Sequence, residues 1–289
     1  MVKYKKILEA FLVIALVLFS FYYTDKVVSI LEENDPIMKK INEEKGLFEE
    51  ASINATIEDN KLIPGYNGLT VDTRASFKKM KNYGSYNASL LVFQEVEPTI
   101  SSIDYYDKYI ISGNGFSTSV SLVFALDSAT YLEKVLNILT DTNTVGTFFL
   151  DGTIIDNNKD LIKGFASTNH ELEVLSYNNG YNEELFKKSL DNIKILTLKD
   201  GKYCYASYDN KEVLDLCNKL NLHTIIPTLK LENNIYTSLK GNLRSGSIIS
   251  IKVTENNLKE LPVVVNYIKQ RGFTLVTLDQ LLNEARNEK

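Results

Sequence analysis

The sequence predicts an α/β domain built from parallel βα units in its C-terminal part. Seven short apolar segments lie between residues 119 and 289, and most precede a stretch with helical periodicity. After the first segment, Leu132, Val135 and Leu139 are spaced i, i+3 and i+7, which places them on one helix face. Strands that alternate with helices in this way favour a seven-stranded (β/α)7 barrel. The expected strands are residues 120–124, 145–150, 172–175, 202–205, 223–226, 247–251 and 273–276.

A doubly wound open sheet is the alternative architecture for the same alternation of strands and helices. Such sheets usually bind a phosphate group at a glycine-rich turn after the first strand. The residues after the first predicted strand are Ala125, Leu126 and Asp127, and no glycine follows closely. The barrel is therefore the preferred prediction.

The N-terminus has the pattern of a membrane signal-anchor. Lysines at positions 3, 5 and 6 precede an apolar run over residues 7–23, interrupted only by Glu9 and Ser20. No cleavage site with small residues follows the run, as a signal peptide would require. Lysines remain on the cytoplasmic side, so we expect a single-pass protein of the cell membrane with an extracytoplasmic C-terminal domain. The alternative is a buried helix of a soluble domain.

Four regions are predicted along the chain. Residues 1–24 form the membrane anchor, and the polar, helix-prone residues 25–62 form a stalk with a helix start near Asp35-Pro36. Residues 63–118 form a small α+β accessory region that includes a helix from Asp72 to Tyr83, closed by Gly84. The barrel occupies residues 119–289.

Composition excludes some functions. The net charge is −5, which argues against nucleic acid as a partner, because phosphate binding normally needs a basic face. The chain has only two histidines and two cysteines, which hardly suffice for a zinc site. Cys204 lies on a predicted strand and Cys217 on the following helix. A disulfide between them is conceivable, but two buried free thiols are the preferred prediction.

Several motifs over residues 119–286 resemble the polysaccharide deacetylases, carbohydrate esterases with a (β/α)7 barrel. Their shared order along the chain carries the likeness. The motifs are Val120 to Phe124, Thr147-Phe148-Phe149, Asn169-His170-Glu171-Leu172, Gly246-Ser247-Ile248-Ile249 with Leu261-Pro262, and Arg271-Gly272-Phe273 with Val276-Thr277-Leu278.

The resemblance implies an amide hydrolase whose catalytic residues have been replaced in this chain. Active members hold zinc or another divalent ion with one Asp and two His, use a neighbouring Asp as general base and a later His as general acid. Apolar or amide residues occupy the base and metal-ligand positions here and a lysine the position of the general acid, so we expect no metal, no other cofactor and no normal catalysis. The replacements are Ala125 and Leu126 for the two Asp, Leu175 and Asn179 for the paired His, Tyr205-Ala206-Ser207 for an Arg-Pro-Pro loop, and Lys252 for the late His.

Candidate site residues lie where the predicted strands end, since barrel sites form at that face. If catalysis remains, Asp127 and Lys252 are the candidates. Aromatic and amide side chains suit the ring faces and hydroxyls of sugars. His170 and His223 are expected to be structural. The candidate ligand-binding residues are Tyr177, Asn178, Asn179, Tyr181 and Tyr205.

These features favour a pseudoenzyme of the cell envelope that binds cell-wall glycan or an envelope protein involved in wall synthesis. A divergent but active carbohydrate deacetylase is the second hypothesis. The third is a protein-interaction scaffold, in which residues 25–118 bind the partner and the barrel serves as a spacer.

Overall fold

The computed structural model describes residues 2–286, and these divide into two compact units. The first unit contains the residues up to Ala51 together with Gly68–Val96. The second contains Ser52–Asn67 and the residues from Glu97 onward. This division differs from the predicted regions. Residues 52–67 were divided between the predicted stalk and the accessory region, but they belong to the same unit as the predicted barrel.

The first unit is a small helical cluster with a two-stranded sheet. Asp35 caps α2 by accepting a hydrogen bond from the Ile37 amide at 2.9 Å, and Asp72 caps α3. Gly84 ends α3 with a φ of 94°, a left-handed conformation that glycine adopts without strain. The predicted helix over residues 72–83 is therefore confirmed. The elements are α1 (Val2–Asn34), α2 (Pro36–Glu44), α3 (Thr73–Tyr83), β3 (Gly68–Val71) and antiparallel β4 (Phe93–Val96).

Helix α1 contains the apolar segment that was predicted as an anchor. Residues Phe11–Asn34 form a stretch of 24 residues with a mean hydropathy of 1.7, and none of this stretch is buried in the protein. It is long and apolar enough to cross a bilayer. The helix continues through residue 34, beyond the predicted end of the anchor at residue 24.

A parallel sheet forms one side of the second unit. Strand β6 is central, and its Phe124 pairs with Phe148 of β7, which in turn pairs with Leu172 of β8. All seven predicted strands exist with small changes of bounds, and β11 was not predicted. The sheet has the order β11-β12-β6-β7-β8, and β13 also pairs with β6. Its strands are β6 (Ser119–Leu126), β7 (Thr147–Leu150), β8 (Glu171–Val174), β11 (Leu229–Leu231), β12 (Ile248–Ile251) and β13 (Thr274–Val276).

The remaining predicted barrel strands belong to a second sheet, which includes strands from the accessory region. Thr224 of β10 pairs in parallel with Tyr109 of β5 and with Cys204 of β9. The predicted boundary at residue 118 therefore falls within one hydrogen-bonded structure. The order is β1-β2-β5-β10-β9, with β1 (Thr56–Glu58), β2 (Lys61–Ile63), β5 (Tyr109–Ile110), β9 (Tyr203–Tyr205) and β10 (His223–Ile225).

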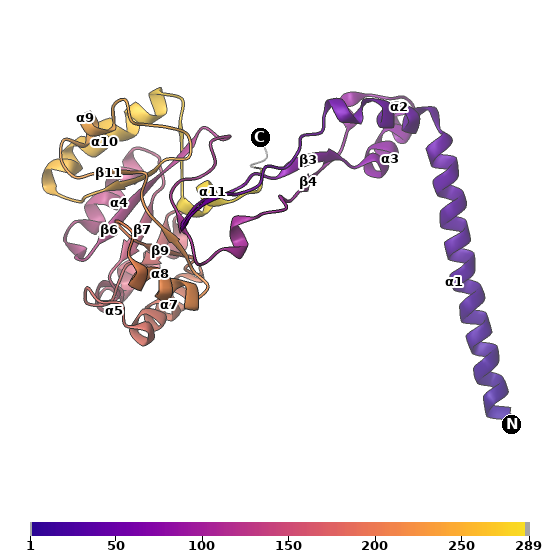
Figure 1. The fold of residues 1–289 in the computed structure, drawn as a ribbon, viewed down its shortest axis with the longest axis horizontal. Coiled ribbons are helices and arrows are strands. Elements are labelled where there is room, and N and C mark those ends of the chain that lie inside the picture. Colours follow the sequence, from indigo (N-terminus) through magenta and orange to yellow (C-terminus); the bar gives the residue numbers. More distant parts are fainter. Residues whose placement is uncertain (1, 287–289) are drawn as a thin grey trace. The chain divides into compact units, whose positions relative to one another are not determined.

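Alternate residues of the strands face two different cores. Phe124 and Phe148 belong to a large cluster with the surrounding helices, whereas Val123 and Phe149 belong to an inner cluster that α11 also enters. Figure 1 shows the helices around the strands. They are α4 (Leu132–Asp141), α5 (Gly152–Asn157), α6 (Lys159–Gly164), α7 (Glu183–Thr197), α8 (Lys211–Lys219), α9 (Ile235–Leu239), α10 (Glu255–Gln270) and α11 (Leu278–Leu282).

Helix α10 contains a proline in its interior. Proline is common in the first turn of a helix, but α10 begins at Glu255 and Pro262 lies inside it. Thr254 caps the observed start by accepting a hydrogen bond from the Asn257 amide at 3.2 Å. Burial of Leu261 and Val265 against the core offsets the backbone hydrogen bond that proline cannot donate.

A buried carboxylate joins the two sheets. Strands β8 and β9 lie side by side but share no ladder, and Glu173 of β8 accepts hydrogen bonds from the Lys202 amide at 2.9 Å and the Tyr203 amide at 3.1 Å. Burial raises the pKa of Glu173 well above its ordinary value. Burial also raises the pKa of Glu171 to about 7, although a hydrogen bond from Thr147 Oγ1 at 2.6 Å opposes the shift.

Cys204 and Cys217 form a disulfide, so the prediction of two free thiols is wrong. Their expected burial is correct. The loop after β9 brings α8 back against the strand, and the two Cα atoms lie 6.4 Å apart. This separation is within the range that a disulfide can span.

Replacing both cysteines by alanine should lower the free energy of unfolding by about 3 kcal/mol, because the bond restricts the unfolded chain. Melting followed by circular dichroism, with and without reductant, measures the loss. The double variant should be insensitive to reductant. Equal melting temperatures for reduced and oxidised wild type would contradict the stabilising role.

The raised pKa of Glu171 should make stability depend on pH. Its pKa in the folded protein is raised, so its contribution is present below about pH 4.5 and is lost as the pH rises through about 7. The difference in stability between Glu171→Gln and wild type should therefore be more favourable to the variant at pH 8 than at pH 5. Melting temperatures at both pH values test this. Glu133→Gln, on an exposed face of α4, should follow the wild type. Parallel curves for Glu171→Gln and wild type would refute the assignment.

Candidate functional site

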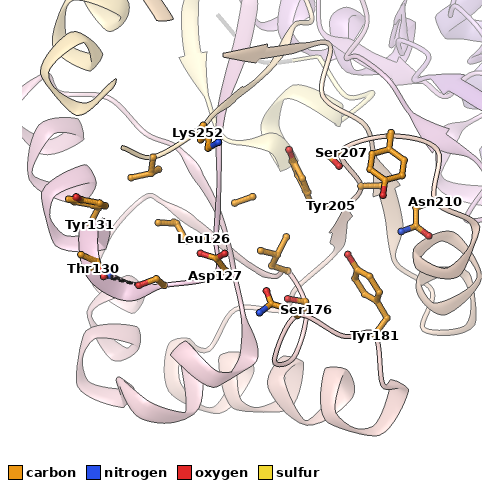
Figure 2. A pocket seen from close by; sticks show the side chains of 17 residues that line it. Leu126, Asp127, Thr130, Tyr131, Ser176, Tyr181, Tyr205, Ser207, Asn210 and Lys252 are labelled. Atoms are coloured by element: carbon orange, nitrogen blue, oxygen red, sulfur yellow. Dashed lines mark hydrogen bonds between the residues drawn. The ribbon is translucent and has the colours of Figure 1, made fainter. Parts of the chain in front are cut away.

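A hollow of about 490 Å³ lies where several parallel strands end (Figure 2). Its lining includes Leu126 at the end of β6, Leu175 after β8, Tyr205 at the end of β9 and Lys252 after β12. In a sheet of parallel strands the carboxyl ends meet at one edge, where ligands usually bind. We call this hollow the rim pocket. Its polar and aromatic lining residues are Asp127, Ser128, Thr130, Tyr131, Ser176, Asn179, Tyr181, Tyr205, Ser207, Tyr208, Asn210 and Lys252.

Most of the residues predicted for the site line the rim pocket. Asn179, Tyr181 and Tyr205 are among them, as are the two catalytic candidates Asp127 and Lys252. The positions that the family likeness assigned to metal ligands, base and acid thus come together in space. This agreement in placement does not by itself assign a role to any of them.

Tyr177 and Asn178 lie outside the rim pocket. The Tyr177 hydroxyl donates a hydrogen bond to Asp156 Oδ2 at 3.0 Å, and the same carboxylate receives Lys188 Nζ at 3.1 Å. The backbone N–H of Asn178 donates a hydrogen bond to Asp151 Oδ1 at 3.1 Å. Asn178 has a φ of 52°, which is left-handed. Both residues stabilise the turn after β8, and nothing in their contacts directs them at a ligand.

Sequence reasoning missed Tyr131 and Tyr208 in the pocket lining. Tyr131 precedes α4, and Tyr208 lies in the loop between β9 and α8 and is 67% exposed. Tyr131 follows the end of a predicted strand by seven residues and Tyr208 by three, and this position after a strand is the signal that would have found them. With Tyr181 and Tyr205 they give the pocket four tyrosines drawn from three different loops.

The base of the rim pocket is fixed by Tyr205. Its hydroxyl lies 2.9 Å from Ser250 Oγ of β12, and its ring packs at 5.5 Å from the ring of Phe149. Burial raises the pKa of the Tyr205 hydroxyl, and the bond to Ser250 partly opposes this. The contact links a strand of the second sheet with a strand of the first, so both sheets define the base.

Asp151 holds the wall formed by residues 176–179. This buried carboxylate accepts hydrogen bonds from Ser176 Oγ at 2.6 Å and from the backbone N–H of Asn179 at 3.1 Å. It also caps α5 through Thr153. Burial raises the pKa of Asp151, but the hydrogen bonds from Ser176, Thr153 and Asn179 outweigh burial and leave the pKa below its ordinary value.

The residues that the resemblance assigned to the metal do not fit a divalent ion. The side chains of Ala125, Leu126 and Leu175 offer no donor atom, and only the side-chain amide of Asn179 remains. Among the side chains that the structure describes, in residues 11–24 and 26–286, no group of three or more His, Cys, Asp and Glu is arranged to hold a metal. No catalytic step through a metal follows from this set.

The two histidines take structural positions away from the pocket. His170 Nδ1 accepts a hydrogen bond from the Gly146 amide at 3.2 Å, and its ring meets Phe148 edge-on. Burial lowers the pKa of His170, and the charge of Lys199 lowers it further. His223 stacks on Tyr106 with ring centres 4.4 Å apart.

The fold is that of the family 4 carbohydrate esterases, known as CE4, to which the polysaccharide deacetylases belong. Wild-type BA3943, a CE4 family pseudoenzyme from Bacillus anthracis, superposes with a TM-score of 0.68 at 23% identity, over 88% of this chain and 97% of that one. PdaA of Bacillus subtilis, a family 4 carbohydrate esterase, superposes with a TM-score of 0.53 at 20% identity, over 62% of this chain and 86% of that one.

At the level of sequence, the chain is 27% identical over 278 residues to the uncharacterized protein YlxY of Bacillus subtilis. The match covers 90% of this chain and 87% of YlxY. No protein-family model matches the chain. The predicted resemblance is therefore confirmed for the fold.

Replacing Asp151 by asparagine should destabilise the pocket wall by about 2 to 3 kcal/mol, because hydrogen bonds to a buried carboxylate are lost. The lowered pKa means that wild type keeps this contribution above about pH 4 and loses it as the pH falls further. Thermal melting at pH 7 and pH 3 tests both statements. Asp160→Asn is the matched control, because the Asp160 side chain is fully exposed. Equal losses in both variants would show that Asp151 does not hold the wall.

Proposed function

We propose that this chain is a catalytically inactive CE4 protein of the cell envelope. It is anchored in the membrane by α1 and binds cell-wall glycan in the rim pocket. One observation carries the proposal. The pocket is retained at the carboxyl ends of the strands, while Ala125, Leu126 and Leu175 stand where a metal-dependent hydrolase needs donors. Shape without reactive groups is the combination expected of a binding protein.

The chemistry of the lining supports a carbohydrate ligand. Tyrosine rings can pack on the apolar faces of sugar rings, and hydroxyl and amide groups can hydrogen-bond to sugar hydroxyls. The rim pocket combines four tyrosines with Thr130, Asn179, Ser207 and Asn210. Each such hydrogen bond contributes only about 1 kcal/mol net, so affinity would depend on several sugar units.

Two features support an extracytoplasmic location. The apolar stretch of α1 can cross a bilayer, with lysines 3, 5 and 6 before it in the sequence. The Cys204–Cys217 disulfide suits an oxidising compartment. The second unit would then face the cell wall.

The second candidate is an active deacetylase with unfamiliar catalytic groups. The presence of both Asp127 and Lys252 in one pocket favours it, because a carboxylate and an amine can exchange protons with a substrate. Wild-type BA3943 is described as a pseudoenzyme, and a BA3943 mutant that superposes with a TM-score of 0.68 at 24% identity is described as having restored activity. These descriptions support loss of activity on a retained fold as the first choice.

Replacing Tyr181 and Tyr205 together by alanine should reduce recovery of the full chain on insoluble peptidoglycan at least ten-fold, because two stacking surfaces are removed. The assay is a pull-down of the detergent-solubilised protein, with melting temperature as a check of folding. Tyr177→Phe is the control, because this residue lies on the same loop but outside the pocket.

Wall binding that survives the double replacement in a folded protein would exclude the rim pocket as the glycan site. The enzyme hypothesis has its own test. Acetate release from peptidoglycan fragments or chitooligosaccharides by wild type, abolished in Asp127→Ala, would replace the pseudoenzyme proposal. Stoichiometric, tightly bound zinc in the purified protein would also overturn it.

A further inference from the structure

The rim pocket contains two charged side chains, and both lack partners. Asp127 and Lys252 are exposed, and neither side chain forms a hydrogen bond or an ion pair with the side chains described in residues 11–24 and 26–286 or with the described backbone. Some other charged groups of the second unit do pair, as Lys202 does with Asp279 at 2.8 Å. A carboxylate and an ammonium group left unpaired in one hollow are available to a ligand.

The strand register explains why the two charges share the pocket. Ser250 of β12 pairs with Val123 of β6, so Lys252 and Asp127 each follow the end of one of two neighbouring strands. Figure 2 shows Lys252 and Asp127 at separate positions around the hollow. All other lining side chains are uncharged. The pocket thus has one negative and one positive position in neutral surroundings.

This charge pattern discriminates between forms of an amino sugar. The amide of an N-acetylated sugar can donate a hydrogen bond to Asp127, but it carries no positive charge to pair with the carboxylate. A sugar with a free amino group carries an ammonium, which forms a charge-assisted hydrogen bond with a carboxylate. Lys252 offers the complementary contact to a ligand carboxylate.

We propose that the rim pocket recognises wall glycan that has already lost acetyl groups, with a free sugar amine at Asp127 and a ligand carboxylate at Lys252. This inference rests on the proposed function, since it names the chemical form of the glycan that the pocket binds. The protein would then read the deacetylated state of the wall without producing it.

The test compares two defined oligosaccharides, the tetramers of glucosamine and of N-acetylglucosamine, by calorimetric titration of the full chain in detergent. The glucosamine tetramer should bind at least ten-fold more tightly. Asp127→Asn should abolish this preference, while Lys252→Gln should leave or increase it, because an opposing positive charge is removed. The preference should shrink at high salt, since exposed charges are screened.

A third ligand tests the carboxylate position. A disaccharide of glucosamine and N-acetylmuramic acid should bind more weakly to Lys252→Gln than to wild type. Melting temperatures confirm that each variant is folded. Equal or tighter binding of the N-acetylated tetramer would overturn the inference, and so would an equal loss of both tetramers in Asp127→Asn. If none of the three sugars binds to the wild-type protein, the proposed function itself is refuted.

Discussion

The arrangement of the second unit depends on the hydrogen bonds of Glu173. Strands β8 and β9 are neighbours without a backbone ladder, and this one carboxylate accepts amide hydrogen atoms that a ladder would otherwise occupy. An unpaired buried amide is costly. The Glu173 side chain therefore supplies the hydrogen-bond acceptors that a neighbouring strand would otherwise provide between β8 and β9. Strand β9 carries Tyr205 into the rim pocket. The position of the pocket's base therefore depends on the hydrogen bonds by which Glu173 joins β8 to β9.

The shape of the rim pocket does not depend on a metal. Asp151 holds the turn after β8 through Ser176 and Asn179, and Ser250 contacts the Tyr205 hydroxyl. These contacts lie beside the reactive positions of the family and use different side chains. Packing and these hydrogen bonds maintain the hollow.

The strands were predictable because each is a short apolar run followed by a helix, a pattern that tertiary packing reinforces. The helix start at Glu255 was not, because the proline signal at Pro262 is local and core burial overrides it. The pairing of β5 with β10 depends on contacts distant in sequence, which no local pattern encodes. The disulfide joins residues only 13 apart, but spacing alone does not distinguish bonded from free thiols. For the site, loop positions were predictable from strand ends, but the direction of Tyr177 depends on Asp156, a partner on another element.

The pairing of β5 with β10 sets the smallest piece of this chain that can remain soluble by itself. Tyr109 and Ile110 cover the edge of β10, and β2 covers the other edge of β5. A fragment cut at residue 119, where the resemblance to the deacetylases begins, would leave β10 with unpaired backbone groups on one side. Exposed strand edges of this kind associate with other chains. A piece that can be transferred intact must therefore include β2 and β5. Because Gly68–Val96 lies between these two strands in the chain and packs with the residues up to Ala51, that piece must also include the residues of the first unit before Ser52.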